Sequence, residues 1–396
     1  MSVDTIHTQP LADAIIEAEG LIRAAPHVKT EQDLVEGLEY LAGLIRASVQ
    51  SACAYDRDFP YLIHSATAQA KVGMDNPDTV YLSTVIRDDC EYVLNGRRGT
   101  TADLNFQVLG GEYNADGTPA SLAAFDDRSL DVAADGTFEV RFGPARLDAG
   151  AGAGYIALEP GATMLLIREC YRDWSSERQG TIRIQRADRI GLAPPPPPPD
   201  LPAKRFNSAG KALVQQVRAF LAFPEWFYLN LPVNTLTEPR LTPGGLATQY
   251  SSVGHFDLAE HQAMIVTVPV SDAPYHGFQL GSMWYISLDF INHQTSLSSA
   301  QARHDPDGKI RYVISEHNPG LTNWLELTGH ERGYLQMRWQ RLSRALAAQD
   351  GPQLELVDFD ELPDRLPFYE EERIDDRGWR QRIAARQAAV AERMLG

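Results

Sequence analysis

The chain has 396 residues, of which 43% are hydrophobic and 22% are charged, so it is long enough to bury a substantial core and to divide into domains. Its 36 basic and 53 acidic residues give a net charge of −17, which repels nucleic acids and anionic membrane surfaces. We therefore expect neither a nucleic acid nor a membrane as a partner.

Residues 1–70 are predicted to form an N-terminal helical segment. Thr30 and Asp33 have the spacing of a capping box, which starts a helix by satisfying its first backbone N–H groups. The following apolar residues recur at helical spacing and indicate a helix packed on a core. They are Leu34, Leu38, Leu41, Ile45 and Val49.

Residues 71–193 are predicted to form a first antiparallel β-sandwich. From Asn76 onward the hydrophobic period changes to two, as expected for half-buried strands. The runs are DNPDTVYLSTVI, CEYVLNG, LNFQVLGG, GTFEVRFG, TMLLIREC and GTIRIQR. Asn-Gly and Asp-Gly pairs near these runs are turn signals, and short strands at this spacing are typical of a sandwich or jelly roll.

Residues 194–199 are an unbroken run of six prolines. Such a run is expected to extend as polyproline II at ~3.1 Å per residue and to hold its flanks apart. We therefore predict a Pro-rich linker at residues 194–207.

Residues 208–345 are predicted to form a helix and a second antiparallel sandwich. Apolar residues from Leu213 to Leu221 share one helical face, which is expected to lie across a sheet. Strand-like runs follow, namely ATQYSSVGHF, AMIVTVPV, GSMWYISLDF, IRYVISEH and YLQMRWQR. The predicted fold class is therefore mainly β with helical additions (α+β), with two sandwich or jelly-roll-like domains.

Residues 346–396 are predicted to form a charged helical tail, in which Trp379, Ile383, Val390 and Met394 can line one side of a helix. Two interpretations stay open. The helix clasps the body of the protein or another subunit, which would give a homo-oligomer, or it is solvated and partly frayed, because charge runs are usually exposed faces.

The cysteines, Cys53, Cys90 and Cys170, lie far apart without a CxxC pair, which argues against a disulfide framework. No signal peptide is recognisable, and no stretch approaches the ~20 apolar residues that span a bilayer. These features predict a cytoplasmic protein.

Familiar cofactor and nucleophile motifs are missing from the sequence. It contains no GxxxxGK[ST], no GxGxxG between a strand and a helix, no GxSxG and no HExxH. His255, Asp257 and His261 lie close together, but they lack the paired histidines two residues apart that jelly-roll metal sites usually present. We therefore predict no cofactor and no metal ligands.

Polar and aromatic residues concentrate in residues 281–340, which we call the histidine-rich segment. Strand alternation along residues 282–290 would place Trp284 on a core face, and Tyr285 with Asp289 on a polar face. In the last strand of the segment, Arg338 alternates with apolar residues and is predicted to face the same way as Tyr334.

The histidine-rich segment also supplies hydrogen-bonding side chains that would suit a polar pocket or a braced loop. They are Asn292, His293, Gln294, His317, Asn323, Trp324 and His330. A single histidine of this kind is more often structural than catalytic, and whether any of His293, His317 and His330 is functional stays open at this point.

The run NHQTSLSSAQARHDPDGKIRYVISEHNPGLTNWLELTGHERGYLQMRW resembles the C-terminal signature of the bacterial domain of unknown function 1214 family. DNPDTVYLSTVI is similar to the opening strand of those proteins and of the related family 1254. The resemblance implies two β-sandwich, jelly-roll-like domains with helical additions, but no catalytic assignment. It brings forward Asn76, Asp78, Tyr81, Trp284, Asn292, His293, Gln294, Ser296, His317, Pro319, Gly320, Asn323, Trp324, His330 and Arg338.

These residue types favour a cofactor-independent acid–base enzyme. We hypothesise a carbon–carbon lyase of the retro-aldol type, releasing a small aldehyde such as formaldehyde from a phenolic, lignin-derived or other hydrophobic catabolite. His293 or His317 would be the base, with Tyr81, Tyr285 or Arg338 stabilising the oxyanion. The predicted substrate-binding residues are Asn76, Tyr81, Asp289, Asn292, Gln294, Asn323, Trp324 and His330.

Two alternatives from other classes remain. One is a non-catalytic protein that binds carbohydrate or another small ligand, because paired sandwiches with exposed aromatic residues commonly do so. The other is a metal-dependent jelly-roll enzyme.

Overall fold

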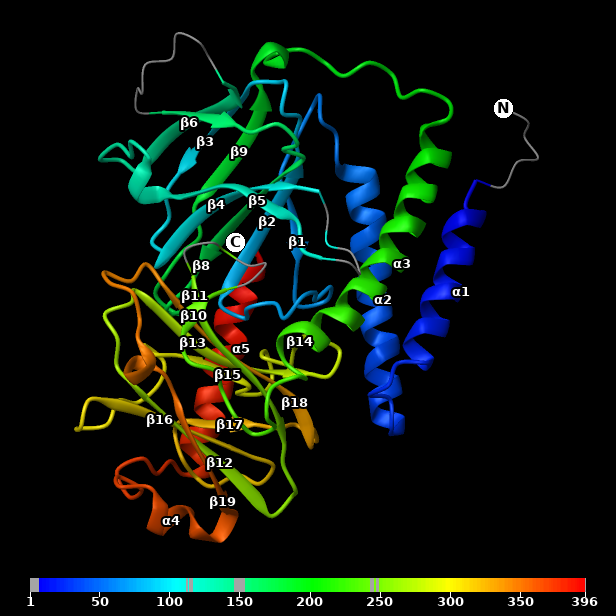
Figure 1. The fold of residues 1–396 in the computed structure, drawn as a ribbon. Coiled ribbons are helices and arrows are strands. Elements are labelled where there is room, and N and C mark those ends of the chain that lie inside the picture. Colours follow the sequence, from blue (N-terminus) through cyan, green and yellow to red (C-terminus); the bar gives the residue numbers. More distant parts are fainter. Residues whose placement is uncertain are drawn as a thin grey trace.

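The computed structural model describes residues 7–111, 113, 117–145, 154–242, 246 and 249–395. Two β-sandwiches lie one above the other, and a layer of three helices runs along one side of them (Figure 1). The helices of this layer are α1 (Gln9–Arg23), α2 (Glu31–Ala54) and α3 (Leu201–Phe227). The prediction of a mainly β fold with helical additions and sandwich-like domains is confirmed.

The start of α2 forms as the capping box predicts. The Thr30 hydroxyl accepts a hydrogen bond from the Asp33 backbone N–H at 3.1 Å, and the Asp33 carboxylate accepts one from the Thr30 N–H at 2.9 Å. Leu44 of α2 is fully buried against Leu213 and Val217 of α3. Much of α3 therefore packs on the other helices, and its last turns reach the second sandwich.

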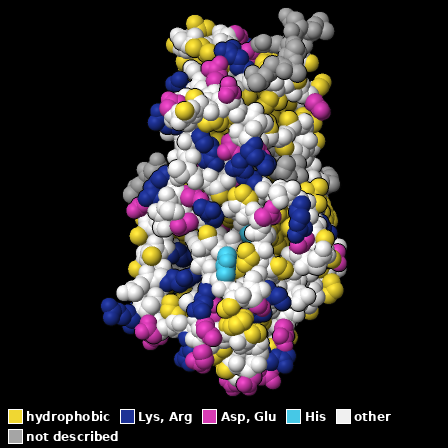
Figure 2. Space-filling view, turned by 90° about the vertical axis from the view of Figure 1, so that its left-hand side faces the viewer, with side chains coloured by type: hydrophobic (Ala, Val, Ile, Leu, Met, Phe, Trp, Pro, Cys, Tyr) yellow, Lys and Arg dark blue, Asp and Glu magenta, His cyan; other side chains and the backbone are white. Residues whose placement is uncertain are grey.

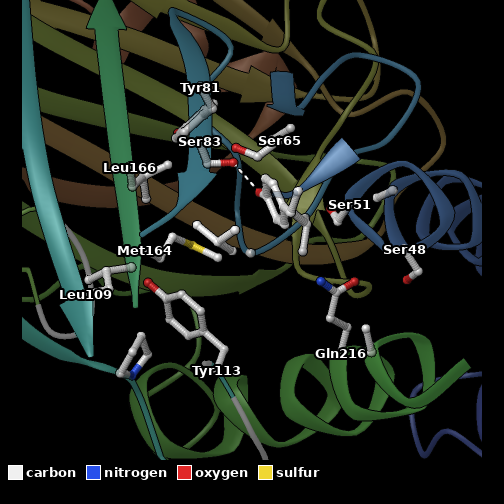
Figure 3. Close-up of a pocket in the computed structure, with 18 of the residues that line it drawn as sticks. Ser48, Ser51, Ser65, Tyr81, Ser83, Leu109, Tyr113, Met164, Leu166 and Gln216 are labelled. Atoms are coloured by element: carbon white, nitrogen blue, oxygen red, sulfur yellow. Dashed lines mark hydrogen bonds between the residues drawn. The ribbon is translucent and has the colours of Figure 1, made fainter. Parts of the chain in front are cut away.

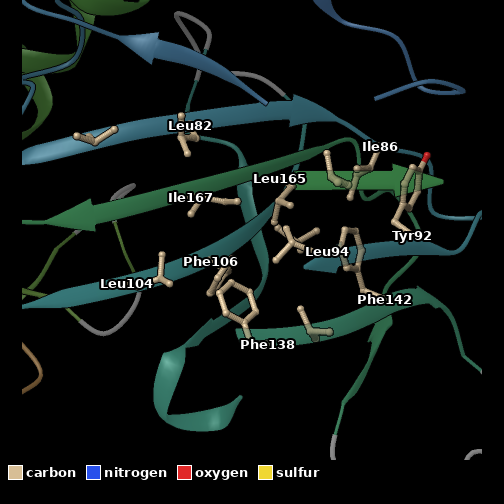
Figure 4. Close-up of a cluster of buried hydrophobic side chains, with 14 of the residues drawn as sticks. Leu82, Ile86, Tyr92, Leu94, Leu104, Phe106, Phe138, Phe142, Leu165 and Ile167 are labelled. Atoms are coloured by element: carbon tan, nitrogen blue, oxygen red, sulfur yellow. The ribbon is translucent and has the colours of Figure 1, made fainter. Parts of the chain in front are cut away.

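The first sandwich consists of two sheets with one apolar core between them. One sheet has the order β1 (Ile63–Ala66), β2 (Thr79–Val85), β8 (Met164–Cys170), β4 (Asp103–Gly110) and β5 (Ala120–Asp126). The other has the order β7 (Tyr155–Leu158), β6 (Thr137–Pro144), β3 (Tyr92–Arg97) and β9 (Thr181–Arg186). Figure 4 shows side chains from both sheets, such as Leu82, Phe106 and Phe142, meeting in this core.

The second sandwich follows α3. Its larger sheet contains β10 (Arg240–Leu241), β11 (Tyr250–Asp257), β18 (Arg332–Gln340), β13 (Tyr275–Ser282) and β14 (Ile286–Ser287), with β15 (Ser296–Ser298) paired to β13. Its smaller sheet has the order β17 (Trp324–Glu326), β16 (Lys309–Ser315), β12 (Gln262–Pro269) and β19 (Gln353–Asp358). The sandwich thus includes β19, which lies beyond residue 345 in the predicted tail.

The predicted strand over residues 282–290 is wrong, because β13 ends at Ser282, the chain turns over residues 283–285, and only Ile286 and Ser287 then pair as strand. Tyr285 has a φ of 58°, which turns the backbone and ends the alternation. Trp284 leaves the sandwich and packs in the helix layer, where its indole N–H donates to the Asp33 carbonyl at 2.9 Å. Tyr285 and Asp289 therefore do not share a strand face.

The C-terminal helix α5 (Asp376–Leu395) clasps the body of its own chain. It runs from the second sandwich up to the first, after the short helix α4 (Leu362–Arg365) (Figure 1). Arg386 donates to the Ser296 carbonyl of the second sandwich at 3.0 Å, and Arg393 donates to the Pro77 carbonyl at 2.6 Å. Val390 is buried in the core of the first sandwich. Of the two interpretations of the tail, the structure shows the packed one.

Three further observations concern the surface and the cysteines. Acidic and basic side chains are interspersed on the face shown in Figure 2. No described helix combines the length and apolar character that a membrane span requires. Cys53, Cys90 and Cys170 are free thiols.

Candidate functional site

A cavity of about 1260 Å³ lies where the two sandwiches meet the helix layer, and we call it the interdomain cavity. Its lining comes from β2 and β8 of the first sandwich, from β11 and β18 of the second, and from α2 and α3. Figure 3 shows Tyr81 and Leu166 facing Ser51 and Gln216 across this space. Cavities between domains are common positions for small-molecule sites.

Strand alternation explains why the first sandwich presents polar groups to the cavity. Along β8, Leu165 and Ile167 point into the apolar core, whereas Leu166 and Arg168 line the cavity. Tyr81 of β2 is the register partner of Arg168, so the phenol and the guanidinium lie side by side on one sheet face.

The second sandwich contributes a matching face. Leu335, Met337 and Trp339 of β18 are buried in the sandwich core, whereas Gln336 and Arg338 line the cavity. The predicted alternation around Arg338 is therefore confirmed.

One end of the cavity is aromatic. Phe220 and Phe223 of α3 pack with Tyr285, and the Tyr285 hydroxyl donates to the Tyr228 hydroxyl at 3.3 Å. Tyr228 in turn donates to the side-chain oxygen of Gln336. Burial raises the pKa of Tyr228 to about 12, so this phenol is neutral near pH 7. The aromatic end therefore offers apolar surface with few charges.

The charge of the cavity lining is opposite to that of the whole protein. Although the chain carries a net charge of −17, the described lining residues include eight Lys or Arg against two Asp. The basic residues are Arg57, Arg87, Arg168, Lys204, Arg205, Lys211, Arg240 and Arg338, and the acidic ones are Asp56 and Asp58.

Arg168 is the most unusual of these cations. Its side chain is buried, with 8% of the residue exposed, and its Nη1 donates to the neutral Gln107 oxygen at 2.7 Å. Among the described residues no carboxylate forms an ion pair with it. Burial lowers the pKa of Arg168, but a guanidinium keeps its charge in proteins at neutral pH. A buried cation without an acid partner is costly.

Arg338, from β18 of the second sandwich, also has no carboxylate partner among the described residues. It is 8% exposed, and its two terminal nitrogens donate to the Gln279 side-chain oxygen and, at 2.6 Å, to the Met74 carbonyl. Both acceptors are neutral.

Tyr81 lies between these two arginines. Its hydroxyl accepts a hydrogen bond from the Asn76 backbone N–H at 3.0 Å and donates its proton to no described residue. Burial raises the pKa of Tyr81, and the charges of Arg338 and Arg168 oppose that rise. The phenol is thus a proton donor beside two cations.

The structure brings together some of the residues that the sequence singles out and separates the others. Asn76, Tyr81, Tyr285 and Arg338 line the interdomain cavity. His293, His317, His330, Asp289, Asn292, Gln294, Asn323 and Trp324 are not among its described lining residues.

Each of the three candidate histidines instead pairs with a carboxylate outside the cavity. His293 contacts Glu326 at 2.9 Å, and the exposed His317 lies 3.3 Å from Glu260. His330 is partly buried, with 13% of its side chain exposed, and contacts Glu36 of α2 at 3.0 Å. Burial lowers the pKa of His330, but the hydrogen bond to Glu36, the charge of Glu36 and the backbone hydrogen bonds to Leu327 and Thr328 together raise the pKa above the usual value.

The other polar residues of the histidine-rich segment brace the backbone. Gln294 donates to the Trp324 carbonyl at 2.6 Å, Asn323 donates to the Arg303 carbonyl at 2.8 Å, and the Trp324 indole donates to the Ser315 carbonyl at 3.0 Å. Asn292 donates to Asp289 within a turn at 2.8 Å. Their hydrogen-bonding groups therefore satisfy the fold itself.

Asn76 belongs to a buried hydrogen-bond network between the domains. Its side-chain amide donates to the Tyr275 hydroxyl at 2.9 Å, and that hydroxyl donates to Asp78 at 2.7 Å. The Trp174 indole also donates to Asp78 at 2.7 Å. Burial raises the pKa of Asp78, against the opposing charges of Arg386 and Arg393. The network holds in place the turn that contains Asn76, whose backbone N–H donates to the Tyr81 hydroxyl.

Within the described residues, no group of three or more His, Cys, Asp or Glu side chains is arranged to hold a metal ion.

Together the fold and the cavity define a two-sandwich protein with a basic interdomain cavity. A crystal structure of an uncharacterized protein from Burkholderia cenocepacia is similar to this chain, with a TM-score of 0.79 and 25% identity over 90% of this chain and 98% of that one. The VPA0106 protein from Vibrio parahaemolyticus aligns with a TM-score of 0.47 and 11% identity over 87% of this chain and 100% of that one. A scan against family models and a search of curated proteins find no match.

Proposed function

We propose that the interdomain cavity binds a small organic anion with an apolar, aromatic body. The observation that carries this proposal is the basic lining of the cavity, with two buried arginines that pair with no described carboxylate, in a protein of strongly negative net charge. An anion in the cavity would supply the missing counter-charge, and Phe220, Phe223 and Tyr285 offer contact surface to flat rings.

The proposal is tested by titrating the full-length protein with a series of carboxylates in a calorimeter. Acetate, benzoate, naphthalene-2-carboxylate and biphenyl-4-carboxylate keep the anion constant while the apolar body grows. We expect affinity to rise along the series, because each added ring buries apolar area at about 25 cal/mol per Å². Lack of binding by the whole series, or equal affinity for acetate and the biphenyl acid, would refute the proposal.

A second candidate function is the cofactor-independent lyase acting on phenolic catabolites. Tyr81 favours it, because an acid–base residue needs an available proton and a charged environment that stabilises its anion. In this version Tyr81 takes the proton-transfer role, because His293 and His317 lie outside the cavity lining. Incubation with lignin-derived phenolic dimers tests it by aldehyde release, and absence of turnover across a broad panel would reject it.

The family and the compartment are proposed on the sequence alone. We propose that the chain is a relative of the domain of unknown function 1214 family, on the strength of the run between Asn292 and Trp339. A cytoplasmic location is proposed because three free, widely spaced cysteines suit a reducing compartment.

A further inference from the structure

We infer that the anionic head of the ligand is a carboxylate held at one point by Arg168, Arg338 and Tyr81, which we call the carboxylate clamp. The inference rests on the proposed function, since it concerns the same cavity, and it specifies the head group and the side chains that bind it. It also implies that the site is complete only when both sandwiches are in place, because Arg168 comes from β8 and Arg338 from β18.

The first two members of the clamp are neighbours by strand register. Tyr81 and Arg168 are directly paired across β2 and β8, and both belong to the face that lines the cavity. Paired side chains on one face of antiparallel strands have Cβ atoms about 4.5–5.5 Å apart. One small anion can therefore contact both groups.

The third member is brought to the same place by the turn before β2. Arg338 donates to the carbonyl of Met74, and Tyr81 accepts from the N–H of Asn76, only two residues further along. The charges of both arginines also act on the Tyr81 phenol. These separate observations place the three side chains around one position.

The clamp has unused donors. Arg168 uses Nη1 for Gln107, while its Nε and Nη2 donate to no described residue, and the Tyr81 proton is equally without a described acceptor. Both arginines are more than nine-tenths buried, so water solvates them far less than a surface cation. Their mutual repulsion is relieved when an anion lies between them.

A carboxylate fits this donor set better than a larger anion. It is planar, matches the guanidinium fork, and accepts at two oxygens with about four lone-pair positions, enough for two arginines and one phenol. The cavity beyond the clamp is lined by apolar side chains such as Leu166, Val253 and Phe220, which suits a head group attached directly to a ring.

The test measures binding of naphthalene-2-carboxylate and of its neutral analogue naphthalene-2-carboxamide to the full chain and to four variants. Arg168→Gln, Arg338→Gln and Tyr81→Phe each remove donors from the clamp. Arg183→Gln is the matched control, because it makes the same substitution at an exposed arginine of β9 that is not among the described lining residues of the cavity. Near-ultraviolet circular dichroism establishes that each variant is folded. If Arg338→Gln does not fold, Arg338→Lys is measured in its place.

We expect Arg168→Gln and Arg338→Gln each to weaken carboxylate binding about 10- to 100-fold, as for the loss of charged hydrogen bonds, and Tyr81→Phe to weaken it about 3- to 10-fold. Arg183→Gln stays within about twofold, and the carboxamide binds all variants alike. In the double variant Arg168→Gln/Arg338→Gln the loss is smaller than the product of the single losses, because both arginines act on one head group.

The clamp is overturned if Arg168→Gln binds the carboxylate like the parent protein, or if the two single losses multiply exactly in the double variant. In either case binding by the parent protein would leave the organic-anion proposal standing. If neither the parent protein nor any variant binds the carboxylate series, both proposals fail together.

Discussion

The histidine-rich segment and the interdomain cavity contain similar polar and aromatic side chains, but these side chains have different partners. In the segment, His293 and His330 have carboxylate partners and Gln294 has backbone partners within the described chain. In the cavity, Arg168 and Arg338 have only neutral acceptors among the described residues. Unpaired charge, rather than local density of reactive residues, distinguishes a binding site from a braced fold.

The largest expected effect concerns catalysis and decides between the two regions. On the lyase hypothesis, Tyr81→Phe lowers turnover of a phenolic substrate about 100-fold or more, because it removes the proton that the reaction needs. His293→Ala is the matched control and leaves turnover unchanged. Steady-state aldehyde release measures the turnover of both variants. Lost turnover in His293→Ala with unchanged turnover in Tyr81→Phe would support His293 as the base instead.

The next effect shows whether the histidine-rich segment serves stability. Trp324 is 5% exposed, and its ring packs against that of Trp379 of α5 at an angle of 37° with centroids 4.9 Å apart. Trp324→Ala is expected to lower the free energy of unfolding by about 3–5 kcal/mol, as for other large-to-small core changes, while the folded variant binds the carboxylate series normally. Urea unfolding and calorimetry measure the two quantities. A variant that is as stable as the parent protein but no longer binds the carboxylates would show that the histidine-rich segment serves binding and not stability.

A smaller effect is expected from the pair of His330 and Glu36, and it depends on pH. Because the pKa of His330 is raised, its contribution is fully present below the ordinary value of 6.5 and is lost as pH rises through the folded pKa. Although burial opposes the shift, the hydrogen bond to His330 lowers the pKa of Glu36, so the contribution of Glu36 is present above 4.5 and is lost as pH falls through its folded pKa. The pair therefore stabilises the fold most between these two values.

His330→Gln is expected to cost about 1 kcal/mol near pH 6, with a difference from the parent protein that shrinks toward pH 9. Urea unfolding across this range measures it. His27, whose pKa burial lowers to about 4, is present in both proteins, so its contribution cancels in the difference. A difference independent of pH would show that the loss is one of packing and not of charge.

The smallest effect is expected at His317. Its side chain is 54% exposed, and so is most of its partner Glu260. Exposed pairs of this kind contribute little, so His317→Ala should change the free energy of unfolding by less than about 0.5 kcal/mol and leave carboxylate binding unaltered. A large loss of binding would place the functional site in the histidine-rich segment after all.

Much of the fold could be predicted because it follows from local signals. The capping box at Thr30 and Asp33 and the period-two runs each depend on neighbours in the sequence, and the structure contains them. The strand predicted from the alternation of residues 282–290 is wrong because Tyr285, which has a left-handed backbone conformation, interrupts it. Nothing in the types of these residues indicates that tertiary contacts would hold a tyrosine in this conformation.

The candidate site could be predicted only in part. Alternation indicates Arg338, and the family resemblance indicates both Arg338 and Tyr81, but neither indicates Arg168. Its signal is an arginine directly after the apolar residues MLLI of the run TMLLIREC, in phase with Leu166 and opposite Ile167. What the sequence could not show is that this face meets β18 of another domain, because that contact depends on how the two sandwiches pack.

The position of α5 also has a consequence for how the protein folds during synthesis. Arg393 contacts the carbonyl of Pro77, 316 residues earlier in the chain. Until the ribosome has made α5, Asp78 lacks the charges of Arg386 and Arg393 that oppose its burial. Contacts this distant in sequence form late and slowly. The contacts that α5 makes with both sandwiches therefore form only after both sandwiches have been synthesised.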